Sequence, residues 1–254
     1  RGCRRPSTNR DVFSALMEPD RTTMPDDRDF EDRRFYGRRK GRPLRKGQQQ
    51  LIDTLLPRLA IALPDTGRLD PKSLFPRKPV QVWLEIGFGG GEHLAEQARA
   101  NRDVGLIGCE VFLNGIATLL AQVAASGLDN VRLYPEDARD LLDALPEASL
   151  DRVFLLFPDP WPKRRHADRR FIQPANLDLL ARLMKPGAEF RVASDDPTYI
   201  GWALAHLVRH PDFAWTAREP TDWRARTADW PQTRYESKAL REGRQAVFLR
   251  FTRR

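Results

Sequence analysis

An α/β fold with a doubly wound, mostly parallel sheet is the fold class that the sequence predicts. Short runs rich in Val, Leu, Ile and Phe alternate with stretches of helical apolar spacing between residues 80 and 209, a pattern typical of βαβ units. A glycine-rich turn follows the first of these runs and opens the next helix. Residues 153–157 are wholly apolar, as expected for a central strand buried on both faces.

The elements follow from local patterns along the chain. A first helix is expected over residues 48–63, where Leu and Ile recur at helical spacing, and a proline-rich connector follows it. Strands are expected at residues 80–86, 105–110, 131–134, 152–157 and 189–193. Helices are expected at residues 91–100, 114–125, 138–144, 168–184 and 197–209. Beyond Pro211 the chain is loop-rich, and residues 246–252 form a predicted closing strand.

Two regions are expected, a flexible tail over residues 1–47 and one domain over residues 48–254. Residues 1–32 contain prolines and charges of both signs without an apolar period, which is typical of a mobile tail. The net charge of the chain is +8, and this surplus equals the eight basic residues between Arg33 and Lys46, a run without acidic residues. We therefore expect this basic run to bind a polyanion such as RNA.

Three other classes of protein are not favoured. Cys3 and Cys109 lie far apart without a CxxC spacing, so the chain has no disulfide or zinc framework and a cytoplasmic location is expected. The longest uncharged stretch carries a polar residue at every fourth position from Asn114 to Ser126, which indicates an amphipathic helix and no membrane span. His206 and His210 share a helix without an obvious third ligand, so no metal is expected.

The glycine turn has the sequence Glu85-Ile86-Gly87-Phe88-Gly89-Gly90-Gly91. Glycines at these positions let a ligand approach the backbone closely. Glu92 stands where a dinucleotide fingerprint has Gly or Ala, and Glu85 would repel a pyrophosphate but attract a cationic sulfonium. The turn therefore favours S-adenosylmethionine over NAD, although a tight turn without a ligand is the alternative.

Carboxylates follow the next two predicted strands. Glu110 ends the second strand, where a carboxylate can accept both hydroxyls of an adenosine ribose, or can simply lie at the surface. Asp137 follows the third strand, where it could lie at the edge of an adenine ring or cap the next helix.

A proline-rich loop follows the fourth strand. In Pro158-Asp159-Pro160-Trp161-Pro162-Lys163 the alternating prolines forbid a helix and hold the intervening side chains in a stiff loop. The loop lies at the carboxyl end of the sheet, where open α/β sheets bind ligands. A rigid structural loop with a solvated basic tail is the alternative.

Four segments together resemble the bacterial tRNA (guanine-N7)-methyltransferase family. They are the glycine turn, Gly108-Cys109-Glu110, the segment from Phe157 to His166, and Thr233-Arg234-Tyr235-Glu236. The resemblance covers about residues 33–254, and its most specific part is the proline-rich loop. It implies a Rossmann-like class I methyltransferase fold, S-adenosylmethionine as the methyl donor, and methylation of guanine 46 in the variable loop of tRNA.

The resemblance also implies roles for residues that match the motifs of the family. The implied cofactor-binding residues are Glu85, Gly87, Gly89, Glu110, Asp137 and Asp159. Asp159 is also the implied catalytic residue. The implied substrate-binding residues are Lys163, Asp195, Thr233, Arg234, Tyr235 and Glu236. The sequence departs from the family in two places. The last motif of the family is usually Thr-Lys-Phe-Glu, whereas here Arg234 replaces Lys and Tyr235 replaces Phe. The fifth strand ends in two adjacent aspartates, so Asp196 could bind the substrate in place of Asp195.

Two rival functions can be separated from methyl transfer to tRNA. A non-catalytic RNA-binding protein on the same scaffold would not need Glu85, Glu110 and Asp159, all of which are present. A nicotinamide oxidoreductase is disfavoured by Glu92 and by the lack of a Tyr-x-x-x-Lys pair near the sheet end. The sequence is compatible with a monomer or a homodimer.

Overall fold

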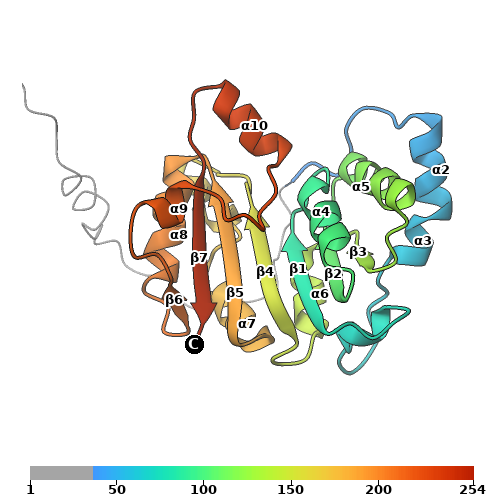
Figure 1. Ribbon diagram of the computed structural model, residues 1–254, viewed down its shortest axis with the longest axis horizontal. Coiled ribbons are helices and arrows are strands. Elements are labelled where there is room, and N and C mark those ends of the chain that lie inside the picture. Colours follow the sequence, from blue (N-terminus) through green and yellow to red (C-terminus); the bar gives the residue numbers. More distant parts are fainter. Residues whose placement is uncertain (1–36) are drawn as a thin grey trace, which may run out of the picture. The chain divides into compact units, whose positions relative to one another are not determined.

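The computed structural model describes residues 37–254, which form an α/β unit around one seven-stranded sheet (Figure 1). The strand order is β3-β2-β1-β4-β5-β7-β6. The five strands from β1 to β5 are parallel to their neighbours, whereas β7 is antiparallel to β5 and β6 is antiparallel to β7. The strands are β1 Gln81–Ile86, β2 Val104–Cys109, β3 Val131–Tyr134, β4 Leu150–Leu156, β5 Met184–Ser194, β6 Phe213–Trp215 and β7 Val247–Arg253. The predicted doubly wound, mostly parallel sheet is confirmed.

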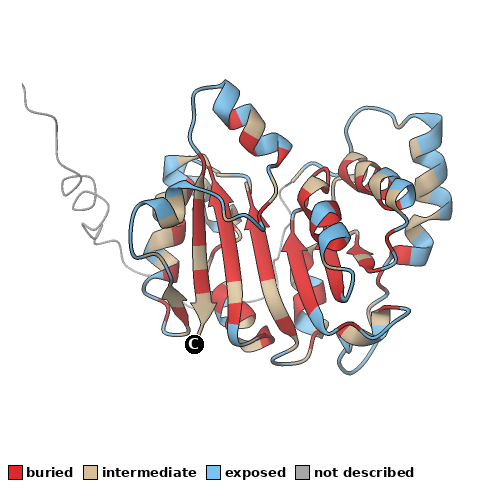
Figure 2. Cartoon of the chain, viewed as in Figure 1, coloured by how far each residue is buried: buried red, intermediate tan, exposed pale blue. Residues whose placement is uncertain are grey.

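Helices cover both faces of this sheet, and each face has its own apolar core. On one face α4 and α5 pack against side chains such as Trp83 and Phe154, and on the other face α6, α7 and α8 pack against side chains such as Leu84 and Val153. The strands are mostly buried, whereas α2 and much of α10 are exposed (Figure 2). The helices are α2 Lys46–Thr54, α3 Leu56–Leu59, α4 Glu92–Ala100, α5 Leu113–Ser126, α6 Ala138–Ala144, α7 Pro174–Leu183, α8 Pro197–Leu207, α9 Thr221–Arg224 and α10 Arg234–Arg241, with 3-10 turns η1 Pro71–Leu74 and η2 Arg164–Arg169.

Prolines account for two differences from the predicted helices. The helix expected over residues 48–63 is divided at Leu55 into α2 and α3, because the ring of Pro57 excludes the helical hydrogen bond at its own nitrogen. The helix expected over residues 168–184 begins only at Pro174, a residue type favoured in the first helical turn, and the chain before it forms η2.

The tertiary environment accounts for two more differences. Strand β5 begins at Met184, five residues before the predicted strand, because the chain passes directly from α7 into the sheet. Helix α10 lies in the part expected to be loop-rich. It begins at Thr233, whose side chain accepts a hydrogen bond from the backbone N–H of Glu236, so the candidate substrate motif is itself a helix start.

The mobile tail predicted for residues 1–32, and the first residues of the basic run, lie outside the described residues. The rest of the basic run is described and contacts α5. The carbonyl of Arg39 accepts a hydrogen bond from the N–H of Leu113, and the side chain of Asn114 accepts one from Gly41 and donates one to the carbonyl of Arg42. This part of the basic run is therefore attached to the helix that follows β2.

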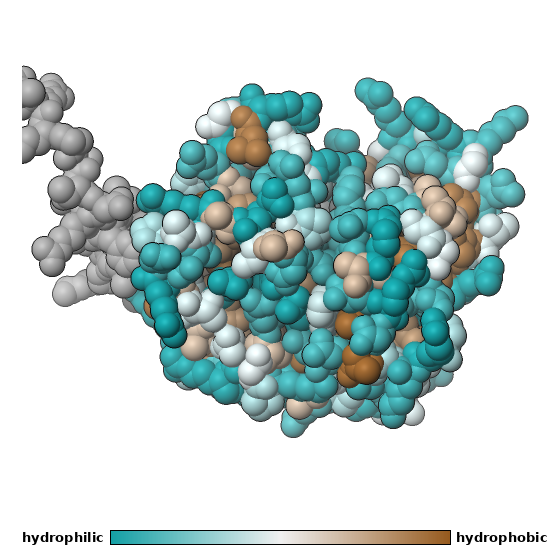
Figure 3. Space-filling model, in the orientation of Figure 1, coloured by the Kyte–Doolittle hydropathy of each residue, from teal (hydrophilic) through white to brown (hydrophobic). Residues whose placement is uncertain are grey.

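Within residues 37–254 no helix combines the length and apolar character that crossing a membrane requires. The same residues contain no group of three or more His, Cys, Asp or Glu side chains arranged to hold a metal ion. The face seen in Figure 3 is largely hydrophilic, with apolar side chains in small groups. Two of the large apolar side chains that remain exposed, Tyr235 and Leu240, belong to α10.

Candidate active site

The predicted site residues lie in loops at one edge of the sheet. Because β1 to β5 are parallel, their carboxyl ends meet at the same edge. The glycine turn follows β1, Glu110 follows β2, Asp137 follows β3, Asp159 follows β4 and Asp195 follows β5. The fold thus brings together side chains that are spread over more than one hundred residues of sequence.

The glycine turn adopts a conformation that side chains would obstruct. Gly87, Gly89 and Gly91 all have positive φ angles, of 70°, 57° and 75°, and Gly91 caps the start of α4. The turn also lies very close to α5, since a Cβ atom added to Gly115 would be 2.1 Å from the carbonyl oxygen of Gly89. Helix α5 therefore packs directly against the backbone of the turn and holds it in place.

The carboxylate of Glu110 binds the backbone of both neighbouring segments. Its Oε2 accepts a hydrogen bond from the N–H of Gly89 at 2.8 Å, and its Oε1 accepts bonds from Val111 and Phe112, each at 2.9 Å. Burial raises the pKa of Glu110 above its ordinary value, and these three backbone hydrogen bonds oppose that shift. Glu110 thus ties the glycine turn to the start of α5, a role that sequence reasoning did not anticipate.

Glu85 is buried in the interface between β1 and α4. Only 2% of the residue is exposed, and its Oε2 lies 2.7 Å from Nδ1 of His93, which is equally buried. On β1 it shares a face with Trp83, whereas Val82, Leu84 and Ile86 pack on the opposite face. A contact of Glu85 with a bound cofactor stays a prediction, and in this structure its carboxylate contacts a histidine.

Asp137 caps the helix that follows it. Its side chain accepts a hydrogen bond from the N–H of Arg139 at 3.0 Å and pairs with the Arg139 guanidinium at 2.5 Å. Burial, together with the carboxylates of Asp140, Glu136 and Asp137, raises the pKa of Tyr134 to about 12. The loop after β3 therefore carries two carboxylates that already have partners: Asp137 pairs with Arg139, and Glu136 pairs with Arg39.

The proline-rich loop has a strained backbone on both sides of Asp159. Phe157 has φ 50° and Trp161 has φ 43°, both in the left-handed region, which costs on the order of 1–3 kcal/mol for each such residue. Asp159 itself is exposed. Strain of this kind persists only where the surrounding structure imposes it, and it often marks a functional site.

Arg170 holds the part of the loop that follows Asp159. It is 5% exposed, donates hydrogen bonds to the carbonyls of Pro160 at 3.0 Å and Trp161 at 2.9 Å, and lies over the ring of Trp202. The sequence did not single out Arg170, because it lies just after the run of basic residues that follows the proline-rich loop, and such a run is usually exposed to solvent. Lys163, a predicted substrate contact in that run, is exposed at the start of η2.

The structure separates the two aspartates at the end of β5. Asp196 accepts a hydrogen bond from the N–H of Tyr199 at 2.9 Å and caps α8. Asp195 instead forms an ion pair with Arg244, which follows α10. Asp195 therefore joins β5 to the C-terminal segment, whereas Asp196 is used by its own helix.

The segment Thr233-Arg234-Tyr235-Glu236 points in two directions. Thr233 and Glu236 are buried in the base of α10, where Glu236 pairs with Arg226 at 2.9 Å. Arg234 and Tyr235 face the glycine turn. The Arg234 guanidinium donates to the Tyr235 hydroxyl at 3.1 Å and lies 3.5 Å from Glu92. A Cβ atom added to Gly89 would be 2.6 Å from the Tyr235 hydroxyl oxygen.

Tyr235 also contacts the proline-rich loop. Its ring is stacked on that of Phe157, with centroids 6.4 Å apart and an interplanar angle of 21°. The glycine turn, the proline-rich loop and α10 therefore meet at one place on the carboxyl edge of the sheet.

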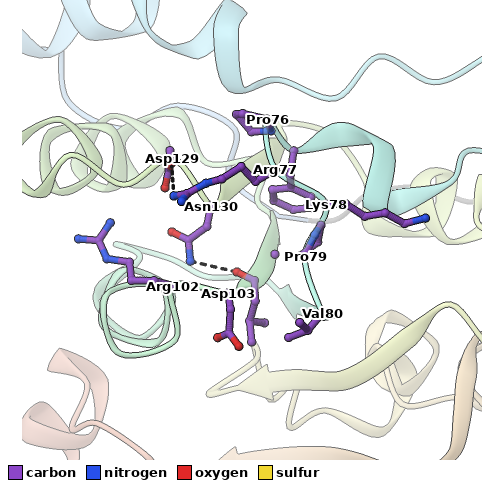
Figure 4. Close-up of a pocket in the computed structure, with 12 residues that line it drawn as sticks. Pro76, Arg77, Lys78, Pro79, Val80, Arg102, Asp103, Asp129 and Asn130 are labelled. Carbon is purple, nitrogen blue, oxygen red and sulfur yellow. Dashed lines mark hydrogen bonds and ion pairs between the residues drawn. The ribbon is translucent and has the colours of Figure 1, made fainter.

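A cavity of about 320 Å³ lies at the opposite edge, where β1, β2 and β3 begin (Figure 4). Its lining includes Arg77, Lys78 and Arg102 along with Asp103 and Asn130. It contains none of the residues predicted for the site. The convergence of motifs, and not this cavity, identifies the candidate active site.

A seven-stranded sheet of this order, with a glycine turn after β1 and acidic residues after β2 and β3, defines a Rossmann-like class I methyltransferase. A family model described as a putative methyltransferase matches residues 79–249. The chain belongs to the tRNA (guanine-N7)-methyltransferase family, as the following relatives show.

One relative, the tRNA (guanine-N(7)-)-methyltransferase of Rhodospirillum rubrum, is 60% identical over 227 residues, which cover 88% of this chain and 89% of that protein. The protein of the same name from Paramagnetospirillum magneticum is 57% identical over 223 residues, with 87% and 93% covered. The crystal structure of PH0851 has a TM-score of 0.50 at 18% identity, covering 72% of this chain and 45% of that one, and it supports the fold alone.

Proposed function

We propose that this protein transfers the methyl group of S-adenosylmethionine to N7 of guanine 46 in the variable loop of tRNA. The methyltransferase class, the donor and guanine N7 follow from the family. The observation that carries the proposal to particular residues is the contact of Tyr235 with both Phe157 and the glycine turn. This contact brings the candidate substrate motif, the proline-rich loop and the glycine turn to one site.

The residues at the carboxyl edge fit S-adenosylmethionine. The donor carries a sulfonium cation that makes its methyl group electrophilic. The carboxylates of Glu110, Asp137 and Asp159 follow β2, β3 and β4 at this edge, and the charge of Asp159 contributes to the raised pKa of Glu110. A cation bound at this edge would be attracted to them. Gly87, Gly89 and Gly91 have positive φ angles and carry no side chains, so these residues of the turn leave its backbone open to a donor. We assign Glu85, Gly87, Gly89, Glu110, Asp137 and Asp159 to this cofactor site.

Guanine N7 is a weak but direct nucleophile. It carries a lone pair and no proton, so its methylation requires no general base, and placement and charge stabilisation supply most of the rate. An ionised Asp159 can accept hydrogen bonds from the N1–H and 2-amino groups of guanine, direct N7 toward the methyl group, and stabilise the positive charge that develops on the purine. Arg170 holds the loop in the required conformation.

Covalent catalysis by Cys109, the cysteine that lies within residues 37–254, is not part of this mechanism. Cys109 is 2% exposed, and burial raises the pKa of its thiol far above the ordinary value. The neighbouring carboxylates of Asp137 and Glu110 raise it further. The thiolate required for nucleophilic attack would therefore not form at neutral pH.

We assign tRNA binding to the basic segments along the same edge. Residues 39–42 of the basic run contact the start of α5, Lys163 ends the proline-rich loop, and Arg234 faces the glycine turn. Asp195 and the segment from Thr233 to Glu236 complete the proposed substrate site. The cytoplasmic location expected from the cysteines suits a tRNA substrate and stays a prediction.

Nucleoside mass spectrometry tests the proposed function. Purified protein and labelled S-adenosylmethionine should convert guanosine to 7-methylguanosine in unmodified tRNA, and a tRNA with adenine at position 46 should remain unlabelled. Label at a different nucleoside would contradict the assignment of the acceptor atom, and label in the adenine-46 tRNA would contradict the position. Binding of tRNA without calorimetric binding of S-adenosylmethionine would support a non-catalytic RNA-binding protein instead.

A further inference from the structure

A row of buried polar side chains runs from the glycine turn to the segment that precedes α10. Glu85 on β1 contacts His93 on α4, and Gln97 lies one helical turn beyond His93. These three residues are only 2%, 2% and 3% exposed. Buried polar groups are retained where each has a partner, since a lone one is costly. We call these three side chains the buried relay.

The relay ends on the backbone of Asp229. The side-chain amide of Gln97 donates a hydrogen bond of 2.6 Å to the Asp229 carbonyl, across 132 residues of sequence. Gln97 Nε2 also lies 3.4 Å from Nε2 of His93, and Gln97 Oε1 accepts a bond from Asn101. One arrangement of hydrogens satisfies every member: His93 donates from Nδ1 to Glu85 and accepts at Nε2 from Gln97.

Asp229 is held from a second side by two strands of the sheet. Its carboxylate accepts a hydrogen bond of 2.7 Å from Arg191 on β5 and lies 3.3 Å from Arg152 on β4. Burial alone would raise the pKa of Asp229, but hydrogen bonds from Arg191 and Thr227 and the charges of both arginines lower it to about 2. The backbone and the side chain of Asp229 therefore fix its position relative to both β1–α4 and β4–β5.

Asp229 begins the stretch that leads into α10. The next residue, Trp230, is 1% exposed and packs edge-on against His93 and Phe248. Thr233 starts α10 three residues later, and Tyr235 on the first turn lies over Gly89. The segment between α9 and α10 can be followed in Figure 1, where it crosses the upper ends of β5 and β4. The glycine turn is thus connected to α10 and the segment before it twice, through the relay to Asp229 and through the contact of Tyr235 with Gly89.

We infer that His93 and Gln97 are positioning residues, which set the location of the candidate substrate helix α10 according to the position of the cofactor turn. The inference rests on the proposed function, because it links donor binding to tRNA binding. Burial of Trp230 supplies the larger share of the anchoring energy, since a buried indole outweighs one hydrogen bond. Loss of the Gln97 bond should therefore shift α10 without detaching it.

The test compares Gln97→Met with Glu96→Gln. Met has nearly the size of Gln and cannot donate to Asp229, whereas Glu96 is an exposed neighbour on the same helix. For Gln97→Met we expect an unchanged Kd for S-adenosylmethionine, an increase on the order of tenfold in KM for tRNA, and a lower kcat. Glu96→Gln should match the wild type in all three quantities. If Gln97→Met folds poorly, Gln97→Asn retains the amide but is too short to reach Asp229.

Hydrogen exchange gives a readout that does not depend on methyl transfer. In the wild type, S-adenosylmethionine should slow amide exchange in residues 225–241, and in Gln97→Met this protection should be abolished. Equal protection in both proteins, or an unchanged KM and kcat with only a lower melting temperature, would overturn the inference. A wild-type protein that shows the protection but does not methylate guanine would instead contradict the proposed function and leave the relay supported.

Discussion

Glu110 shows how one residue can be both a structural link and a candidate ligand. Its carboxylate accepts three backbone hydrogen bonds that join the glycine turn to α5, and it remains partly exposed at the carboxyl edge. A carboxylate oxygen has lone pairs for two bonds, so the same group can also accept a ribose hydroxyl. Its substitution should therefore affect both donor binding and stability.

Replacement of Glu110 with Ala should weaken binding of S-adenosylmethionine by roughly 1 to 3 kcal/mol, the usual cost of losing a charged hydrogen-bond acceptor. The melting temperature should also fall, because Gly89, Val111 and Phe112 lose their acceptor. Calorimetry and thermal melts measure the two effects. Glu147→Ala, an exposed carboxylate on the loop before β4, is the control and should change neither. Donor affinity equal to that of the wild type would remove Glu110 from the cofactor site.

The raised pKa of Glu110 predicts a pH dependence of defined sign. Because the folded protein binds this proton more tightly than the unfolded chain, stability falls as pH rises from the ordinary pKa of 4.5 through the raised value. Donor affinity should change in the opposite direction and weaken as pH falls through the raised value, since the protonated carboxyl is a poorer acceptor. Glu110→Gln should abolish both slopes. Parallel slopes in Glu110→Gln and wild type would assign them to another group.

Asp159 is predicted to act on the reacting base more than on tRNA affinity. Asp159→Ala should lower the single-turnover rate of methyl transfer by roughly 100-fold, the effect of removing one preorganised electrostatic partner from an active site. The Kd for tRNA should remain close to that of the wild type. Asp168→Ala removes an exposed carboxylate from the nearby turn η2 and should leave the rate unchanged. A near-normal rate in Asp159→Ala would make Asp159 a structural residue.

At the scale of elements, the packing of α5 against the glycine turn decides the shape of the site. Gly115 lies in α5 at the point where any side chain would collide with the carbonyl of Gly89. Gly201 lies in α8 and has no atom within 4 Å of an added Cβ. The two glycines provide a matched pair of helical positions that differ in their surroundings.

Gly115→Ala should displace the glycine turn and destabilise the protein by roughly 1 to 3 kcal/mol, the usual cost of overpacking. It should also weaken binding of S-adenosylmethionine. Gly201→Ala should leave donor binding unchanged and stabilise the protein by up to about 1 kcal/mol, because Ala is the better helix former. Chemical denaturation and calorimetry measure these quantities. If Gly115→Ala binds the donor as tightly as the wild type, the turn is not held by α5.

At the scale of the whole molecule, the two edges of the sheet carry basic residues in different settings. Three exposed basic residues lie beside α5 at the carboxyl edge, namely Arg38, Lys40 and Arg42. Arg39, in the same segment, forms an ion pair with Glu136. Arg77, Lys78 and Arg102 are exposed at the amino edge, around the cavity of Figure 4. Only the first group is close to the candidate active site.

Triple substitution of Arg38, Lys40 and Arg42 with Gln should reduce the slope of log affinity for tRNA against log salt, by on the order of one for each phosphate that is no longer neutralised. Binding of methylatable and non-methylatable tRNA should weaken alike, since phosphate contacts do not specify sequence. The same substitution of Arg77, Lys78 and Arg102 removes equal charge at the other edge and should leave the slope near that of the wild type. Equal slopes in both variants would contradict a tRNA contact of residues 38–46.

Local sequence determined most of the sheet and the locations of the loops that carry the candidate site residues. The predicted strand over residues 131–134 and the helix over residues 138–144 have the observed bounds, since apolar periodicity reports burial directly. The order of the glycine turn, Glu110, Asp137 and Asp159 after successive strands could also be predicted, because parallel strands bring their carboxyl ends to one edge. Prolines at positions 57 and 174 could have corrected two helix ends, because their effect is local.

Tertiary structure alone decided what these side chains contact. Glu85 meets His93, Asp195 meets Arg244 and Arg170 meets the carbonyl of Pro160, and none of these partners follows from spacing along the chain. Spacing likewise could not tell that Asp196 caps α8 while Asp195 pairs with Arg244, and the choice of Asp195 as a substrate contact stays a prediction. Hydrogen bonds and ion pairs depend on distances of a few ångströms between segments that are far apart in sequence. The periodicity of a sequence specifies which face of an element is buried, and packing of the whole chain specifies the partner that it meets there.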